Sequence, residues 1–192
     1  MKQGYSRQKT NRRLNWILIT SGLFIVCRSL LALVITTTTV TGTSMQPTLV
    51  SGQEAWVDKV SPPKLGDLVV IDAHLANPNH AGDTSTYVKR VLAGPGDQIE
   101  STPQGLRLND QPVYEHYLAN AVTHDTWTIS DLTQGEFWSG PTDDTVPPDY
   151  VFVLGDNRNH SEDSRTFGYV PQDAIIGVAH PYPWDQPKLL KR

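Results

Sequence analysis

The chain has 192 residues, of which 38% are apolar and 19% are charged, and its formal net charge is −4 with a pI near 5.8. This length suits one domain, or one domain with an added lobe. The acidic balance argues against a nucleic-acid-binding protein, which needs a basic surface. Because Cys27 is the only cysteine, no disulfide within the chain is possible, and we interpret it as a small apolar residue.

The N-terminal part of the chain predicts a membrane anchor. Residues 1–14 carry five basic side chains and no acidic one, and residues 16–35 form the only long apolar run. Its 20 residues match the ~30 Å hydrocarbon core of a bilayer. Because basic flanks stay on the cytoplasmic side, we predict a cytoplasmic segment at 1–14, a transmembrane anchor at 15–35 and an extracytoplasmic domain at 36–192.

Arg28 interrupts the apolar run. A central arginine costs about 2.5–3.5 kcal/mol on insertion scales, and we expect the apolar residues on both sides to outweigh this cost. In one alternative the span ends at Arg28 and residues 29–40 form an interfacial strand. In another, the segment is a cleavable signal peptide. We favour the uncleaved anchor, because a serine motif at residue 44 follows the run so closely.

Beyond the anchor, the sequence predicts a mostly-β fold of short antiparallel strands. Short apolar runs are separated by turns rich in glycine and proline, and no strong amphipathic helix interrupts them. Weak periodicity between Tyr114 and Asp149 indicates an irregular stretch, so we predict a small insertion at about 98–149 and a peripheral tail from Pro181. The expected strands cover residues 54–59, 68–71, 86–92, 98–100, 106–108, 150–154 and 175–179, after an extended segment at 36–43.

Two residues indicate chemistry: Ser44 beyond the anchor and Lys89 in the expected strand at 86–92. A serine becomes a nucleophile when a neighbouring base takes its proton. A lysine in an apolar strand usually packs its stem flat and keeps its amine in water. If burial removes that water, a pKa that falls from about 10.4 to roughly 7–8 makes the amine a general base. Alternation sends Lys89 and Arg90 to opposite faces, so we expect one of them to point inward.

Four segments, together with the apolar run before them, closely resemble the successive boxes of type I signal peptidases, the bacterial leader peptidases of family S26. One such box is a moderate signal, whereas four in the family's order are specific. The resemblance covers most of the chain outside residues 98–149, and it implies the β fold shared by signal peptidases and repressor-type proteins. The segments are GTSMQPTL at 42–49, GDLVV at 66–70, YVKRVLAGPGD at 87–97 and GDNRNHSEDSR at 155–165.

The resemblance implies a Ser–Lys dyad, in which Ser44 is the nucleophile and Lys89 is the general base. Considered without the resemblance, the acidic residues of the segment at 155–165 are typical of a solvated turn. The supporting residues that it implies are Ser161, which orients the lysine amine, the carboxylate–guanidinium pair of Asp163 and Arg165, and Asp156 in the same support.

The sequence departs from one branch of the family two residues before the nucleophile. Some members carry there a serine whose hydroxyl helps to bind the oxyanion, whereas this chain has Gly42. We therefore expect the oxyanion hole to rest on the backbone N–H of Ser44 and on the backbone of Gly42. In an enzyme built around it, one such donor is worth about 3–4 kcal/mol.

The histidines do not suggest a metal site. None of the six falls at metal-ligand spacing, so we expect no metal and no cofactor. The residues of a Ser-His-Asp triad need not be close in the sequence, so their spacing alone does not exclude such a triad. His160 adjoins Ser161, and we interpret it as a loop residue.

The resemblance implies a membrane-bound endopeptidase that removes signal peptides from exported preproteins. Its partners would be membrane lipid and preproteins with small residues at −1 and −3, bound as an added β-strand, and no nucleic acid. One alternative is a self-cleaving repressor-type Ser–Lys protease, which would need a DNA-binding head where this chain has its apolar run. Another is a non-catalytic anchored binding or assembly protein on a peptidase scaffold, which would need a lost dyad.

Overall fold

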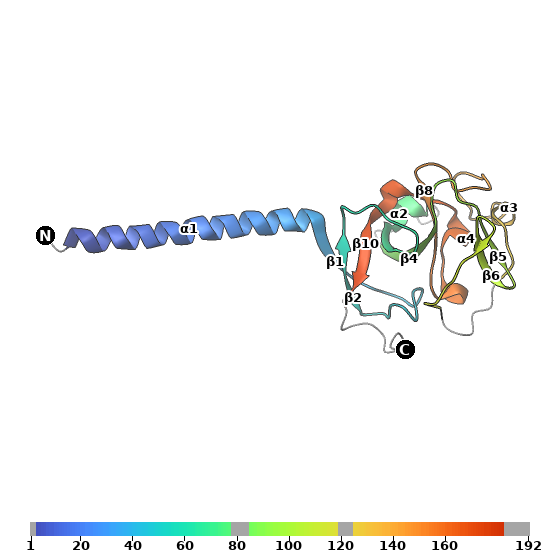
Figure 1. Ribbon diagram of the computed structural model, residues 1–192, viewed down its shortest axis with the longest axis horizontal. Helices are drawn as coiled ribbons and strands as arrows, with labels where there is room; N and C mark the ends of the chain where they lie inside the picture. The colour runs from blue at the N-terminus through green and yellow to red at the C-terminus, as the bar shows by residue number, and fades with distance from the viewer. Residues whose placement is uncertain (1–2, 78–84, 119–124, 183–192) are drawn as a thin grey trace. The chain divides into compact units, whose positions relative to one another are not determined.

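The computed structural model describes residues 3–77, 85–118 and 125–182, with side chains from Arg12 onward in the first helix. The expected tail lies outside the described residues except for its first two positions. The chain divides into two compact units, Met1–Thr36 and Thr37–Arg192. In chain order the elements are α1 (Gln3–Val34), β1 (Ile35–Thr39), β2 (Glu54–Asp58), β3 (Leu68–Asp72), α2 (Ala73–Ala76), β4 (Thr86–Ala93), β5 (Ile99–Thr102), β6 (Gly105–Leu108), β7 (Gln111–Pro112), α3 (Ile129–Leu132), β8 (Tyr150–Leu154), η2 (Arg158–His160), α4 (Ser164–Phe167), β9 (Val170–Pro171), η3 (Gln172–Ala174) and β10 (Ile175–Pro181) (Figure 1).

Helix α1 makes up most of the first unit. Its stretch Arg12–Val34 has 23 residues and a mean hydropathy of 2.3, which is long and apolar enough to cross a membrane. Its large apolar side chains, such as Leu23 and Phe24, are exposed. The helix runs through Arg28 without a break, so extended chain begins at Ile35 and not at residue 29.

The second unit is built on a seven-stranded sheet with the strand order β1-β2-β10-β3-β4-β8-β9 (Figure 1). The pairings from β2 to β9 are antiparallel, so the predicted mostly-β fold of short antiparallel strands is confirmed. Side chains of β3 alternate between two buried clusters: Val69 and Ile71 belong to one, and Leu68 and Val70 to the other. The sheet is therefore covered on both faces where β3 pairs with β4.

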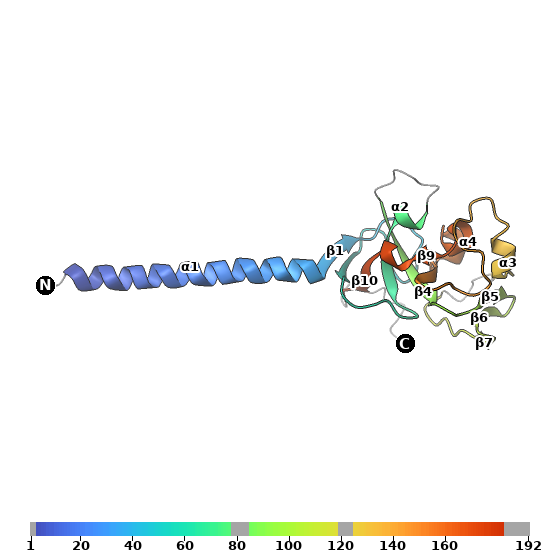
Figure 2. The ribbon, with the colours of Figure 1, turned by 90° about the horizontal axis from the view of Figure 1, so that it is seen from above.

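The expected strands at 98–100 and 106–108 correspond to β5 and β6. The segment at 98–149 contains a second, three-stranded sheet, β5-β6-β7, which lies at the end of the domain away from β10 (Figure 2). The backbone of Trp127 pairs with Ser101 of β5, and the Trp127 ring lies 5.6 Å from that of Phe152 in β8. Phe152 and Tyr169 share this cluster, which joins the small sheet to the large one.

Phe152→Ala tests how strongly the two sheets depend on each other. Phe152 is completely buried and contacts the rings of Trp127 and Tyr169, so its truncation leaves a cavity. We expect the free energy of unfolding to fall by about 3–5 kcal/mol. Urea denaturation of the full chain in detergent micelles, followed by tryptophan fluorescence, measures the change.

The control is Tyr114→Ala, because the Tyr114 side chain is 88% exposed. We expect its stability to stay within about 0.5 kcal/mol of the wild type. Equal losses in the two variants would contradict a packing role for Phe152.

Candidate active site

Strand β4 carries Lys89 into the interior of the domain. Lys89 lies opposite Val69 of β3, and only 3% of it is exposed. This burial lowers the pKa of the amine below its ordinary value of 10.5, although the charges of Asp163 and Glu162 act in the opposite direction. The usual arrangement of a strand lysine, with its amine in water, is therefore not found here.

The neighbouring Arg90 is also buried, and it lies opposite Leu68. Alternation does send Lys89 and Arg90 to opposite faces of the sheet. Our expectation that only one of them points inward is nevertheless wrong, because both faces are covered. Since a guanidinium keeps its proton and an amine can release it, Lys89 is the member of this pair suited to act as a base.

Lys89 and Ser44 line the same cavity. The Lys89 amine donates a hydrogen bond to Ser161 Oγ over 3.2 Å, which fixes the direction of the amine. Ser44 is half-buried, and its hydroxyl donates to no acceptor in the described part of the chain. The cavity has a volume of about 260 Å³ and is lined by residues 39–45, residues 85–89, His160 and Glu162.

The loop that follows β8 holds the backbone around Ser44. The N–H of Asn157 donates to the Ser44 carbonyl over 2.9 Å, and its side-chain amide donates to the Thr43 carbonyl over 3.1 Å. Gly42 has a φ of +84°, in the left-handed region that favours glycine. Among the described residues, the Ser44 N–H has no acceptor, so it is available to a developing oxyanion.

Gly155 is the residue where the Ser44 loop and Ser161 meet. A Cβ at this position would lie 2.6 Å from the Ser44 carbonyl oxygen and would overlap the Ser161 side chain. The Gly155 N–H donates to Asp163 Oδ2 over 3.0 Å, and its carbonyl accepts from Arg158 Nε over 3.2 Å. The Gly155 backbone is thus fixed on both sides, in a space that only glycine fits.

Asp163 and Arg165 form a bidentate pair. Arg165 donates from Nε over 2.8 Å and from Nη2 over 2.9 Å to the two carboxylate oxygens. Asp163 is completely buried, so it is no part of a solvated turn. Arg165 Nη2 also donates to the Arg158 carbonyl over 2.7 Å, which ties the loop 155–165 to itself.

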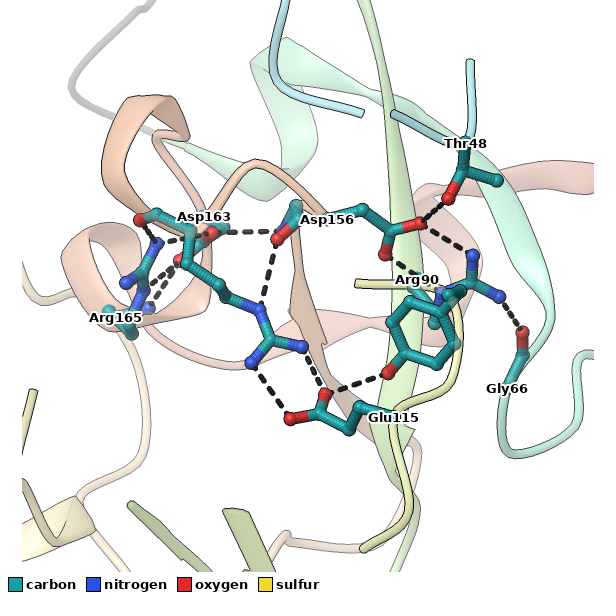
Figure 3. A network of polar contacts seen from close by, with 10 residues as sticks. Thr48, Gly66, Arg90, Glu115, Asp156, Asp163 and Arg165 are labelled. Carbon is teal, nitrogen blue, oxygen red and sulfur yellow. Dashed lines mark hydrogen bonds and ion pairs between the residues drawn. The ribbon is translucent and has the colours of Figure 1, made fainter. Parts of the chain in front are cut away.

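Asp156 forms an ion pair with Arg90, separate from the pair of Asp163 and Arg165. It is buried and accepts from Arg90 Nε over 2.8 Å and from Arg90 Nη2 over 2.6 Å, and Thr48 donates to it as well. Arg90 Nη1 donates to the Gly66 carbonyl over 2.7 Å. One residue from each of the four recognised segments therefore meets here, as Figure 3 shows.

Two residues of the small insertion join this network, although no sequence pattern pointed to them. Glu115 forms an ion pair with Arg158, and the two side chains are 6% and 5% exposed. The Tyr117 hydroxyl donates to Glu115 over 2.8 Å, and the Tyr117 ring lies 3.8 Å from Arg90 Cζ (Figure 3). They fall in a stretch without periodicity, where only tertiary contacts identify them.

Among the described histidines, His160 lines the cavity of Ser44 and Lys89. His160 is exposed, and its Nδ1 lies 3.3 Å from the Asn157 amide oxygen, whereas a Ser-His-Asp triad requires a carboxylate there. Within residues 3–77, 85–118 and 125–182, no group of three His, Cys, Asp or Glu side chains is placed to hold a metal ion. His80 and His124 lie outside the described residues.

Comparisons with known proteins bear on this site. The family model described as signal peptidase, peptidase S26, matches residues 13–184. The signal peptidase IB of Staphylococcus aureus is 31% identical over 175 residues, with 85% of each chain covered. The signal peptidase I of Leptolyngbya laminosa is 35% identical over 141 residues, which cover 71% of this chain and 62% of the relative. A crystal structure of signal peptidase I from Enterococcus faecalis V583 is 30% identical, with a TM-score of 0.47, and covers 62% of this chain and 97% of that one.

These matches place the chain among the peptidases. More specifically, it belongs to the signal peptidase family, peptidase S26, because the family model spans most of its length. The resemblance carried by the four segments is thereby confirmed, and the function is the processing of signal peptides.

Gly155→Ala tests the close approach of Ser44 and Ser161. The added methyl group forces the two apart, and a displacement of about 1 Å at a reacting group costs roughly a hundredfold in rate. We expect a loss of that size in the cleavage of a preprotein by the purified chain. The matched control is Gly94→Ala, where a Cβ meets only Asp97 Oδ2 at 3.8 Å, and it should cleave as the wild type does.

Lys89→Met tests the burial of the amine. Because burial lowers the Lys89 pKa, the unfolded chain binds more protons than the folded chain between that lowered pKa and 10.5. Wild-type stability therefore rises with pH across this interval. Since methionine has no proton to lose, we expect Lys89→Met to melt at a higher temperature near neutral pH, with a difference that shrinks as the pH approaches 10.5.

Circular dichroism melts at a series of pH values measure this effect. The control is Lys64→Met, because Lys64 is exposed, and its melting temperature should follow that of the wild type at every pH. A Lys89→Met variant that melts below the wild type throughout would contradict a cost of burying the amine.

Proposed function

We propose that this chain is a membrane-anchored serine endopeptidase, a signal peptidase I, which cleaves exported preproteins with the dyad of Ser44 and Lys89. One observation carries the proposal: the Lys89 amine is buried, donates to Ser161 and borders the cavity that Ser44 also lines. Burial favours the neutral amine, which is the form that accepts a proton.

In the acylation step, the neutral Lys89 amine takes the proton of Ser44 Oγ while that oxygen attacks the scissile carbonyl. Ser161 accepts one N–H of the amine, which leaves the lone pair of the amine free to accept the Ser44 proton. The oxyanion accepts from the Ser44 N–H and from the Gly42 backbone. The Lys89 ammonium then gives its proton to the leaving amine, and a water that the same lysine activates releases the acyl group from Ser44.

The supporting residues act on this dyad through the loop 155–165. Ser161 orients the amine, and the Asp163–Arg165 pair holds the loop that carries Ser161. Asp156 contributes separately, because its pair with Arg90 joins the same loop to strand β4.

The substrate is an extended preprotein segment with small residues at −1 and −3, as the family resemblance implies. An extended peptide can pair with exposed backbone as an added strand, and the cavity of about 260 Å³ borders two segments suited to this, residues 39–45 and 85–89. We propose that residues 15–35 anchor the chain in membrane lipid, that residues 1–14 are cytoplasmic and that residues 36–192 work outside the membrane.

Cleavage of a preprotein by the purified full chain in detergent tests the dyad. We expect Ser44→Ala and Lys89→Ala each to lower kcat by about 10⁴-fold or more, as the loss of a nucleophile or its base does in serine proteases. Lys89→Arg should be inactive at every pH, because a guanidinium does not release its proton. Wild-type kcat/KM should rise with pH to a plateau whose midpoint lies below 10.5, since it reports the lowered pKa of Lys89.

The matched controls are Ser51→Ala and Lys64→Ala, which change exposed side chains and should leave cleavage intact. If Ser44→Ala and Lys89→Ala cleave as the wild type does, the dyad assignment is wrong. A chain that processes no preprotein would favour the non-catalytic anchored protein, and one that cuts only itself would favour the self-cleaving protease.

A further inference from the structure

We infer that Glu115 and Tyr117 are positioning residues for the proposed catalytic loop, because they hold Gly155 and Asp156 in place through two buried arginines. The inference rests on the proposed function, since it concerns the geometry of the proposed dyad. It gives the insertion at 98–149 a role in the reaction.

The first connection runs from Glu115 through Arg158 to Gly155. The guanidinium of Arg158 engages both carboxylate oxygens of Glu115, with Nη1 donating to Oε2 over 3.2 Å and Nη2 donating to Oε1. Its Nε donates to the Gly155 carbonyl over 3.2 Å. Because both side chains are almost completely buried, removing the Glu115 charge leaves the guanidinium without a counter-charge and draws it away from Gly155 toward water.

The second connection runs from Tyr117 through Arg90 to Asp156. The Tyr117 ring covers the Arg90 guanidinium with 3.8 Å between the ring centroid and Cζ, a geometry that favours a cation over an aromatic face. Arg90 in turn makes its two hydrogen bonds to Asp156. Burial and the charge of Glu115 raise the pKa of the Tyr117 hydroxyl, so it stays protonated and donates to Glu115.

The two connections converge on the consecutive residues Gly155 and Asp156, and Glu115 joins them because it binds both Arg158 and the Tyr117 hydroxyl. Gly155 packs against the Ser44 carbonyl and the Ser161 side chain without room for a methyl group. A shift of Gly155 therefore moves Ser161, the residue that holds the Lys89 amine. Through this contact, the insertion determines the geometry of the dyad.

Glu115→Gln tests the inference, because it keeps the shape of the side chain and removes the charge. We expect kcat for preprotein cleavage to fall between about tenfold and a hundredfold, with KM within about twofold of the wild type. A residue that only stabilises the fold would lower the melting temperature and leave the kcat of the folded enzyme unchanged.

A second readout does not depend on activity. The pKa of Lys89 is measured by ¹⁵N NMR of the lysine side chains, with the Lys89 signal assigned from its loss in Lys89→Arg. When the segment of Gly155 and Ser161 loosens, water reaches the amine, so we expect the Lys89 pKa to rise toward 10.5 in Glu115→Gln. The other groups that surround the amine, which the substitution leaves in place, are Tyr87, His160, Glu162, Asp163 and Arg165.

Two further variants sharpen the test. Glu100→Gln breaks the partly exposed pair of Glu100 with Arg107, 3.1 Å apart in the same insertion, and should change neither kcat nor the Lys89 pKa. Tyr117→Phe keeps the ring over Arg90 and removes only the hydroxyl, so it should show the same changes at smaller size. It also serves as the test if Glu115→Gln does not fold.

The outcomes separate the inference from the proposed function. An unchanged kcat and an unchanged Lys89 pKa in both Glu115→Gln and Tyr117→Phe would overturn the positioning role. A Lys89 pKa that moves in Glu115→Gln, in a chain whose wild type cleaves no preprotein, would support the positioning role and overturn the proposed function.

Discussion

The buried amine of Lys89 is the constraint on which the rest of the domain depends. An ammonium removed from water is costly unless a partner compensates it, so burial favours the neutral form of the amine, which donates to Ser161. That state requires apolar cover on the face of the sheet where Lys89 lies, which Val69 and its neighbours in the core supply. It also requires Ser161 at a fixed distance, and this is the task of the loop after β8.

Three arginine–carboxylate pairs surround that loop: Arg90 with Asp156, Arg158 with Glu115, and Arg165 with Asp163. Buried pairs of this kind add little net stability, because the charges lose their water on folding. Their planar, bidentate hydrogen bonds do, however, fix the relative orientation of the two side chains in each pair. Each pair has a guanidinium or carboxylate that also bonds to backbone, at Gly66, Gly155 or Arg158. Through these bonds, the three ion pairs hold the backbone of the loop in a defined conformation.

Glycine has a related role at one point of this path. Most of the loop is held by hydrogen bonds, but the contact of Gly155 with the Ser44 carbonyl and with Ser161 is purely steric. A steric contact of this kind transmits displacement directly, since packed atoms have no free volume to absorb it. In the positioning role that we propose for Glu115, this contact carries the effect of a segment distant in the chain to Ser44 and Ser161.

Local sequence patterns anticipated much of the fold. The expected strands at 68–71 and 150–154 correspond to β3 (Leu68–Asp72) and β8 (Tyr150–Leu154), because continuous apolar runs bounded by turn residues are a local signal. We did not predict the pairing of Trp127 with Ser101, because residues that pair across a long stretch of chain produce no periodic pattern in the local sequence. The burial of Arg90 was missed for a similar reason: alternation gives the face of a side chain and not what covers that face.

The sequence by itself determined the apolar composition of the N-terminal helix, the order of the short strands and, through its four recognised segments, the family. These properties depend on residue type and near-neighbour spacing, which a linear chain displays directly. Only the tertiary structure decided that Asp156 pairs with Arg90 and that Glu115 and Tyr117 reach the loop of Gly155. Such contacts form where segments that are distant in the chain pack together. A charge buried there needs a counter-charge nearby in space, whatever the position of that counter-charge in the chain.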